Sequence, residues 1–144
     1  MNLTRPVTAV LMLAACSSVK RSPPPGPNVV TITATDYAFS APDTIPAGLT
    51  TFRMSNQGRE LHQAVIAGAG GRSFEEIQAA LFKEGPIPDW VTFAAGPGVV
   101  MGGDNSNATG NVAPGNYLIM CFIASPDGQL HVQKGMFRRL NQPT

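Results

Sequence analysis

Apolar and polar residues alternate along much of the chain after residue 27, and this alternation predicts half-buried β-strands. Val30, Ile32 and Ala34 alternate with threonines, and a similar alternation follows at 49–55. The largely apolar segment 117–124 predicts a central strand that is buried on both faces. Turn sequences rich in Gly, Pro and Asn separate these segments from further expected strands at 61–67, 90–93, 108–112 and 135–140.

The segment 74–83 has the signals of a helix. Ser73 precedes it as the expected N-cap, and Glu76, three residues later, completes a capping box. Apolar residues recur at helical spacing within the segment, and Gly85 and Pro86 predict its end.

About seven or eight short strands with one inserted short helix predict an all-β fold, an antiparallel Greek-key β-sandwich or barrel. The chain has 144 residues, which fits one domain. No stretch of 20–50 residues repeats itself, so solenoids and propellers are excluded. Charged residues make up only 13% and the net charge is +1, which argues against a nucleic-acid binder and against a coiled coil.

The N-terminal residues have the features of a bacterial lipoprotein leader. The apolar run 6–15 follows Arg5 and is too short to span a bilayer. It ends in Ala14-Ala15-Cys16, which resembles a lipobox, so we expect a signal peptide at 1–15 and lipidation of Cys16. An ordinary secretory peptide beside a chance cysteine is the alternative interpretation.

The residues after Cys16 predict a tether and a location. Residues 16–27 are rich in proline and favour an extended spacer, which leaves 28–144 as the folded domain. Ser17 stands where an Asp retains lipoproteins at the inner membrane. We therefore expect a lipid anchor in the bacterial cell envelope, at the outer membrane on its periplasmic or surface side.

The residues able to carry chemistry are few. The chain has two histidines, His62 and His131, and once Cys16 is lipidated Cys121 is its remaining thiol, so an intramolecular disulfide is excluded. A buried core cysteine is the simpler interpretation of Cys121. However, His131 and Met136 follow it closely in the chain, and a thiolate, a thioether and two imidazoles form the soft ligand set that selects copper.

Three segments carry a resemblance to a known family. Residues 55–62 resemble a polar turn that leads into a first ligand histidine, 114–121 resemble a Pro-Gly-x-Tyr strand that runs into a ligand cysteine, and 131–136 resemble a closing His and Gly-Met. In these segments the sequence resembles the cupredoxins, the plastocyanin and azurin family of blue copper proteins. The resemblance implies one copper ion that alternates between Cu(I) and Cu(II), with the ligands His62, Cys121 and His131 in a plane and Met136 in the axial position.

The sequence departs from the family pattern at two places. Nine residues separate Cys121 from His131, more than in the small electron carriers, and Gln63 stands where many members have Asn. Pro126-Asp127-Gly128 is a tight-turn sequence. We therefore expect the long loop to fold outward as a hairpin and to return His131 to the cysteine, where its ring offers an edge for electron transfer.

The two-residue period of a strand also predicts where the thiol lies. His62 shares one face of its segment with Ala64 and Ile66, and Cys121 shares one face with Tyr117, Ile119 and Ile123. If both faces point into the same sandwich, the sulfur lies within a few ångströms of a His62 ring nitrogen.

Residue counts exclude other metal and catalytic classes. Multicopper oxidases and copper nitrite reductases need more histidines, the binuclear copper centre of cytochrome oxidase needs two cysteines, and zinc enzymes need a short-spaced imidazole pair. No serine lies in the Gly-x-Ser-x-Gly motif of hydrolases.

We therefore expect a membrane-tethered electron carrier and not an enzyme. Its partner would be a redox protein such as a c-type cytochrome, an oxidase or a reductase, and we expect a monomer. Two alternatives stay open: a Cu(I) storage or delivery protein, which the methionines favour, and a metal-free interaction module. The methionines in question are Met54, Met101, Met120 and Met136.

Overall fold

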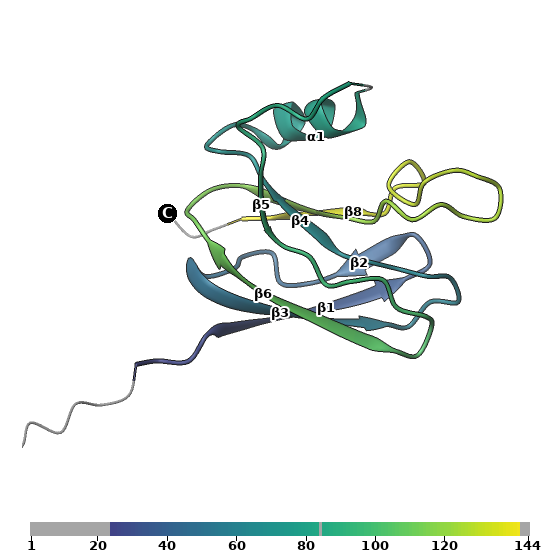
Figure 1. Ribbon diagram of the computed structural model, residues 1–144, viewed down its shortest axis with the longest axis horizontal. Coiled ribbons are helices and arrows are strands. Elements are labelled where there is room, and N and C mark those ends of the chain that lie inside the picture. The colour runs from purple at the N-terminus through teal and green to yellow at the C-terminus, as the bar shows by residue number, and fades with distance from the viewer. Residues whose placement is uncertain (1–23, 84, 142–144) are drawn as a thin grey trace, which may run out of the picture.

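Two four-stranded sheets pack face to face in the computed structural model, which describes residues 24–83 and 85–141 (Figure 1). The expected signal peptide, the lipidation site Cys16 and the tether up to residue 23 lie outside the described residues. The first sheet has the order β2-β1-β3-β6, with β1 (Asn28–Thr35), β2 (Ala38–Ser40), β3 (Gly48–Asn56) and β6 (Asn105–Val112). The second has the order β5-β4-β7-β8, with β4 (Val65–Gly68), β5 (Thr92–Ala95), β7 (Tyr117–Met120) and β8 (Phe137–Leu140).

The strand pairs are antiparallel with the exception of β1 and β3, which run parallel. β2 folds back on β1, and the connection 41–47 then returns the chain along the sheet, so that β3 starts beside the beginning of β1. The buried side chain of Ile45 lies in this connection, and its N–H donates to the carbonyl of Asn141 just after β8. The expected all-β sandwich is confirmed, with one parallel pair that the alternation pattern does not reveal.

The core between the sheets follows the two-residue period of the strands. Val30, Ile32 and Ala34 of β1 are buried there, as the alternation predicted. In the second sheet Ile66 and Ile119 face this core, whereas Leu118 and Met120 belong to a second cluster on the outer face. All four residues of β7 are therefore buried, because the first sheet packs on one face of the second sheet and the second cluster covers its other face.

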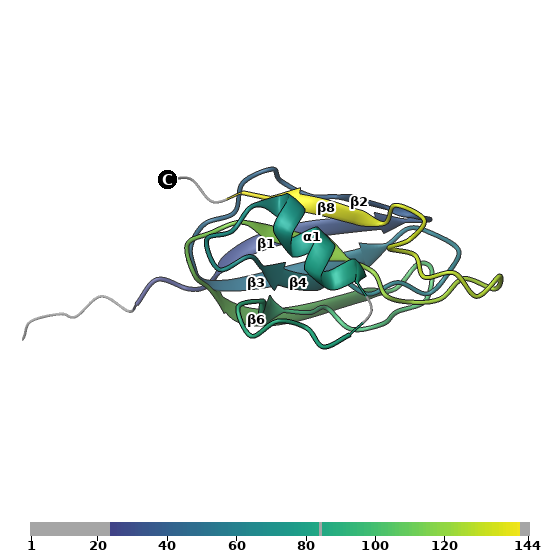
Figure 2. The same cartoon turned by 90° about the horizontal axis from the view of Figure 1, so that it is seen from above.

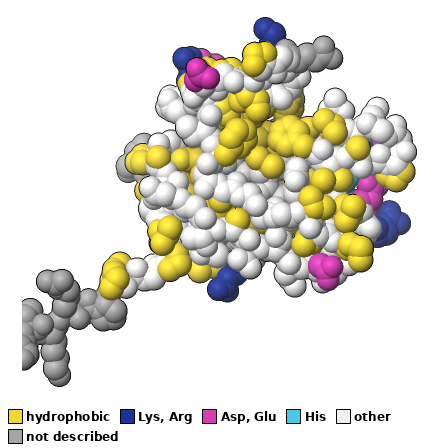
Figure 3. Space-filling model, in the orientation of Figure 1, with side chains coloured by type: hydrophobic (Ala, Val, Ile, Leu, Met, Phe, Trp, Pro, Cys, Tyr) yellow, Lys and Arg dark blue, Asp and Glu magenta, His cyan; other side chains and the backbone are white. Residues whose placement is uncertain are grey.

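The cover on the outer face is the helix α1 (Phe74–Phe82), which lies across the second sheet (Figure 2). Ser73 Oγ accepts from the N–H of Glu76 at 3.2 Å, and the Ser73 N–H donates to Glu76 Oε2 at 2.9 Å, so the predicted capping box is present. Ile77 is its buried anchor. The partly buried members of the second cluster reach the surface beside α1, where hydrophobic side chains gather (Figure 3).

Several strand boundaries differ from the prediction. The segment 117–124 leaves the sheet after Met120 because Cys121 turns into the loop towards β8. β6 begins at Asn105, three residues earlier than expected, and the prediction missed this part because its outward side chains are polar. β4 begins at Val65, since the preceding residues pair with the loop 97–100 instead of with the sheet. β5 lies two residues later than expected, and the short strand β2 was not predicted.

No helix in the described part of the chain has the length and apolar character needed to cross a bilayer.

β5 passes close to β6 at Gly110. A Cβ atom at this position would overlap the backbone carbonyl of Ala94. We expect Gly110→Ala to lower the free energy of unfolding by about 2 kcal/mol or more, because the backbone of β5 would have to shift. Urea denaturation measures this. Gly98→Ala is the matched control, since its Cβ would meet nothing closer than Ser106 Oγ at 3.8 Å, and equal stabilities of the two variants would contradict the account.

Candidate metal centre

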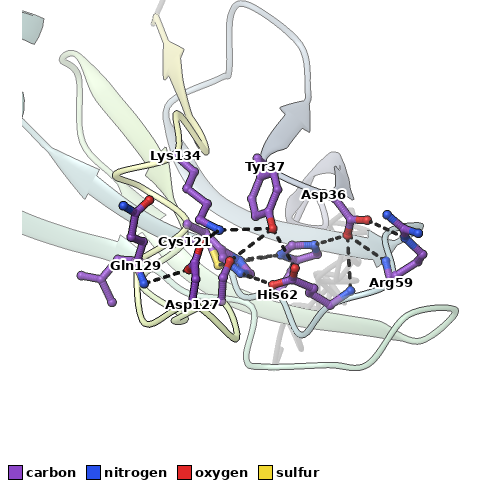
Figure 4. Close-up of polar contacts among 12 residues, drawn as sticks. Asp36, Tyr37, Arg59, His62, Cys121, Asp127, Gln129 and Lys134 are labelled. Atoms are coloured by element: carbon purple, nitrogen blue, oxygen red, sulfur yellow. Dashed lines mark hydrogen bonds and ion pairs between the residues drawn. The ribbon is translucent and has the colours of Figure 1, made fainter.

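Two imidazoles and one thiol converge at one end of the sandwich (Figure 4). Cys121 Sγ lies 3.4 Å from Nδ1 of His131 and 4.0 Å from Nδ1 of His62. The two Nδ1 atoms are 3.1 Å apart, and all three side chains are fully buried. The structure thus brings together three of the predicted ligands through the atoms with which they would bind a metal.

The parity of the strands places the thiol and His62 on the same side, as predicted. Ala64 and Ile66 on the face of His62, and Tyr117 and Ile119 on the face of Cys121, all belong to the core between the sheets. The sulfur is therefore inside the sandwich near the His62 ring.

Asn56 holds the loop that carries His62. Its Nδ2 donates to the carbonyls of Glu60 at 2.8 Å and of Val100 at 3.0 Å, and its Oδ1 accepts from the N–H of Gly58 at 2.9 Å. The side chain is fully buried at the end of β3. This single amide fixes the path of the chain from β3 to His62.

The loop between Cys121 and His131 is a small hairpin, as the turn sequence predicted. The Gly128 N–H donates to the Ser125 carbonyl at 2.9 Å, and Gly128 has a φ of 82°, a left-handed conformation that favours glycine. The His131 N–H then donates to the carbonyl of Ile123 at 2.8 Å. The extra residues therefore project outward, and His131 returns to the thiol.

Met136 closes the same loop and is fully buried. Its N–H donates to the His131 carbonyl at 2.9 Å, and its carbonyl accepts from the Cys121 N–H at 3.3 Å. The backbone of the fourth predicted ligand is therefore bonded to the backbones of two others.

Two carboxylates that the sequence reasoning missed face the far side of the imidazoles. Glu60 Oε2 lies 2.8 Å from His131 Nε2, and Asp36 Oδ1 lies 3.4 Å from His62 Nε2. Glu60 stands two residues before His62, which is a weak signal in the sequence. Asp36 lies in the turn between β1 and β2 and has no such signal, because only the fold brings it to the histidine.

The electrostatics of the site fix the protonation of the groups. Backbone N–H donation from Arg59 lowers the pKa of Asp36 to about 2, and the hydroxyl of Tyr37 lowers the pKa of Glu60. Burial lowers the pKa of His62 and raises the pKa of the Cys121 thiol, against which the backbone N–H groups of Gln63 and Ile123 act. At neutral pH both carboxylates are ionised and can only accept hydrogen bonds.

This protonation pattern leaves the Nδ1 atoms as acceptors. A neutral imidazole carries one proton, and a carboxylate beside Nε2 draws that proton to Nε2. The Cys121 thiol has one proton to offer to two buried lone pairs that lie 3.1 Å apart, so one of them stays without a partner, and a cation among the three atoms would satisfy both. The residues therefore fit a soft or borderline metal ion, and a thiolate with two imidazoles fits copper.

The expected exposed edge of His131 is a prediction that the structure contradicts. The His131 ring is fully buried, because Glu60 covers Nε2 and the Tyr37 ring packs edge-on against it at a centroid distance of 5.3 Å. Tyr37 reaches this position from a turn in which its own φ is 67°. Lys134 Nζ lies over the Tyr37 ring, 4.8 Å from its centroid.

Solved structures of auracyanins and of an azurin resemble this chain. One is the dithionite-reduced auracyanin of the photosynthetic bacterium Roseiflexus castenholzii, with 22% identity, a TM-score of 0.56 and coverage of 83% of this chain and 100% of that one. Another is auracyanin A of Chloroflexus aurantiacus, described as a "blue" copper protein, with 21% identity, a TM-score of 0.54 and coverage of 82% and 100%. The azurin Az-iso2 of Methylomonas sp. strain J has 16% identity, a TM-score of 0.51 and coverage of 81% and 98%.

At these identities the likeness shows the fold: the chain has the cupredoxin fold that the sequence predicted. Neither a protein-family model nor a curated protein sequence matches the chain.

The role of Asn56 gives a testable prediction. We expect Asn56→Ala to lower the free energy of unfolding by about 2–3 kcal/mol, because three backbone groups would lose their partner at a buried position. The same variant should broaden the His62 ring signals in NMR spectra, since the loop 57–61 is then free to move. Asn107→Ala, at an exposed position of β6, is the matched control. A stable Asn56→Ala with sharp His62 signals would show that other contacts fix this loop.

Proposed function

We propose that the chain is a one-electron carrier that holds a single copper ion through His62, Cys121 and His131, with Met136 as the axial ligand. The observation that carries the proposal is the convergence of two Nδ1 atoms and one sulfur at a fully buried place in a cupredoxin fold. Copper bound there would supply a Cu(I)/Cu(II) couple, and the thiolate and the other ligands would set its reduction potential.

The residues of the chain prepare the site before any metal binds. The carboxylates favour the ring protons on Nε2, so both Nδ1 atoms point inward with a lone pair that can bind a metal. Burial raises the pKa of the Cys121 thiol, and the backbone N–H groups of Gln63 and Ile123 offset part of this effect. Because the donors need little movement to bind, the cost of reorganisation on electron transfer is small.

The burial of the donors favours electron transfer over catalysis. His62, Cys121 and His131 have no exposed surface, so a substrate cannot reach them unless a loop moves. An electron has no such requirement, because it can tunnel through the packed side chains around the site. The proposed function is therefore that of a carrier and not of an enzyme.

We include a lipid anchor on Cys16 in the proposed function, with a place in the bacterial envelope. The described residues 24–27 enter β1 at one end of the sandwich, and the loop between β7 and β8, with the metal centre, projects at the other (Figures 1 and 2). A domain tethered in this way would present the metal end away from the membrane. A c-type cytochrome or an oxidase or reductase in the envelope would then be within its reach.

A Cu(I) store is a weaker candidate than the sequence suggests. Met54 and Met120 are buried in two separate clusters on opposite faces of the second sheet, and Met101 is exposed. Core packing accounts for the first two, so they do not add sulfur ligands to the site.

The absorption spectrum of the copper-loaded protein tests the proposal. We expect an intense visible charge-transfer band that Cys121→Ser and His62→Ala abolish and that His131→Ala abolishes or shifts strongly. Met136→Leu should keep the colour and raise the reduction potential, because the axial bond is weak and its loss favours Cu(I). Met101→Leu is the matched control, since this methionine is exposed, and it should change neither colour nor potential.

Three results would contradict parts of the proposal. Tight binding of Cu(I) without colour would favour storage or delivery, and no copper binding at all would favour a metal-free interaction module. If His131→Ala leaves the band unchanged while His62→Ala removes it, His131 is not a ligand.

A further inference from the structure

Glu60 connects the His131 imidazole to Tyr37 through both of its carboxylate oxygens. Oε2 lies 2.8 Å from His131 Nε2, and Oε1 accepts from the Tyr37 hydroxyl at 2.7 Å. The Tyr37 hydroxyl oxygen is in turn 3.3 Å from Ser125 Oγ and 3.5 Å from Lys134 Nζ. The carboxylate is thus held from two sides, although none of its atoms belongs to the donor set.

The contact between Glu60 and His131 Nε2 determines which ring nitrogen of His131 can bind a metal. Because an ionised carboxylate only accepts hydrogen bonds, its neighbour Nε2 must carry the ring proton. The lone pair of the ring is then on Nδ1, which lies 3.4 Å from Cys121 Sγ. Rotation of the ring would break the 2.8 Å contact, so Glu60 also fixes its orientation.

Glu60 also brings a negative charge close to the His131 ring. Among the described residues, the ion pairs of Glu60 are with His131 alone. The nearby Lys134 does not neutralise it, because Lys134 Nζ pairs with Asp127 Oδ2 at 2.6 Å. The negative charge of Glu60 therefore acts directly on the His131 imidazole.

Asp36, the carboxylate on the other histidine, is in a different situation. It pairs with the Arg59 guanidinium at 3.2 Å and accepts from the backbone N–H groups of Arg59 and Glu60. Its contact with His62 is longer, at 3.4 Å. Asp36 is largely satisfied without the histidine, so its effect on the metal centre should be the smaller of the two.

We propose that Glu60 is a positioning residue that holds the Nδ1 lone pair of His131 towards the thiol and lowers the reduction potential of the copper centre. A negative charge one ring away from the ion stabilises Cu(II) more than Cu(I), because the oxidised ion carries the larger charge. The inference rests on the proposed function for its effect on the potential. Its effect on the ring proton holds without any metal.

Two substitutions separate the charge of Glu60 from its hydrogen bond. Glu60→Gln keeps an acceptor for Nε2–H and removes the charge, whereas Glu60→Ala removes both. Glu75→Gln is the matched control, because Glu75 is an exposed carboxylate on α1 that pairs with Arg139. Asp36→Asn tests the predicted asymmetry between the two carboxylates.

The first readout is the reduction potential and the Cu(II) affinity of the copper-loaded full chain. We expect Glu60→Gln to stay blue, to have a higher reduction potential and to bind Cu(II) about 10- to 100-fold more weakly, with a smaller loss for Cu(I). Asp36→Asn should raise the potential less, and Glu75→Gln should not change it. Equal potentials and Cu(II) affinities for Glu60→Gln and Glu75→Gln in a blue protein would overturn the inference and leave the proposed function intact.

The second readout needs no metal. Nitrogen-15 NMR of the metal-free protein should show the His131 proton on Nε2 in the wild type and in Glu60→Gln, and a mixture of tautomers in Glu60→Ala. A proton on Nδ1 in the wild type would overturn the positioning role. If the wild type binds copper without a blue band, the proposed function fails, and this readout still decides the role of Glu60.

Discussion

Two imidazole lone pairs and one thiol, within 4.0 Å of one another and shielded from water, are the constraint on which the metal end of this protein depends. Such a group of donors is unfavourable alone, because electron-rich atoms repel when no cation or proton lies among them. The fold must therefore hold them in place. It does so with the buried amide of Asn56, which holds the loop that carries His62. Backbone hydrogen bonds join Cys121, His131 and Met136 in the same way.

The remainder of the fold supplies the rigidity that this arrangement requires. The second sheet is packed on both faces, by the other sheet and by α1, so the end of β7 that leads into Cys121 has little freedom. The charged residues of the site, Asp36 and Glu60, contact the Nε2 atoms of the histidines, on the side of each ring away from the thiol. Donors and charges are thus separated by the width of an imidazole, which lets the charges act on the donors without binding in their place.

Much of this architecture was predictable from the sequence because its signals are local. The capping box of α1 involves residues three apart, and the turn at residues 126–128 carries its own conformational preferences. Strand parity placed His62 and Cys121 on the same side of the core. The ends of the strands were less predictable, since β6 has polar outward side chains and 61–64 pair with a loop.

The surroundings of the imidazoles were not predictable, for a physical reason. Asp36 and Tyr37 reach the histidines from a turn that is remote in the chain. The parallel pairing of β1 with β3 places Asp36 beside the segment that leads to His62, and the packing of the two sheets brings Tyr37 to His131. The same contacts explain the one error about the site, the expected exposure of His131. A hydrophobicity pattern describes which residues are buried in strands, but it does not describe which polar side chains fold over a loop.

X-ray absorption fine structure of the copper-loaded protein, in both oxidation states, tests the central claim most directly. The account predicts one short copper–sulfur distance and two imidazole nitrogens around the ion. It also predicts that these neighbours and distances change little when Cu(II) is reduced to Cu(I), because the fold holds the donors in place. A copper environment without a short sulfur neighbour, or one that loses an imidazole on reduction, would contradict it.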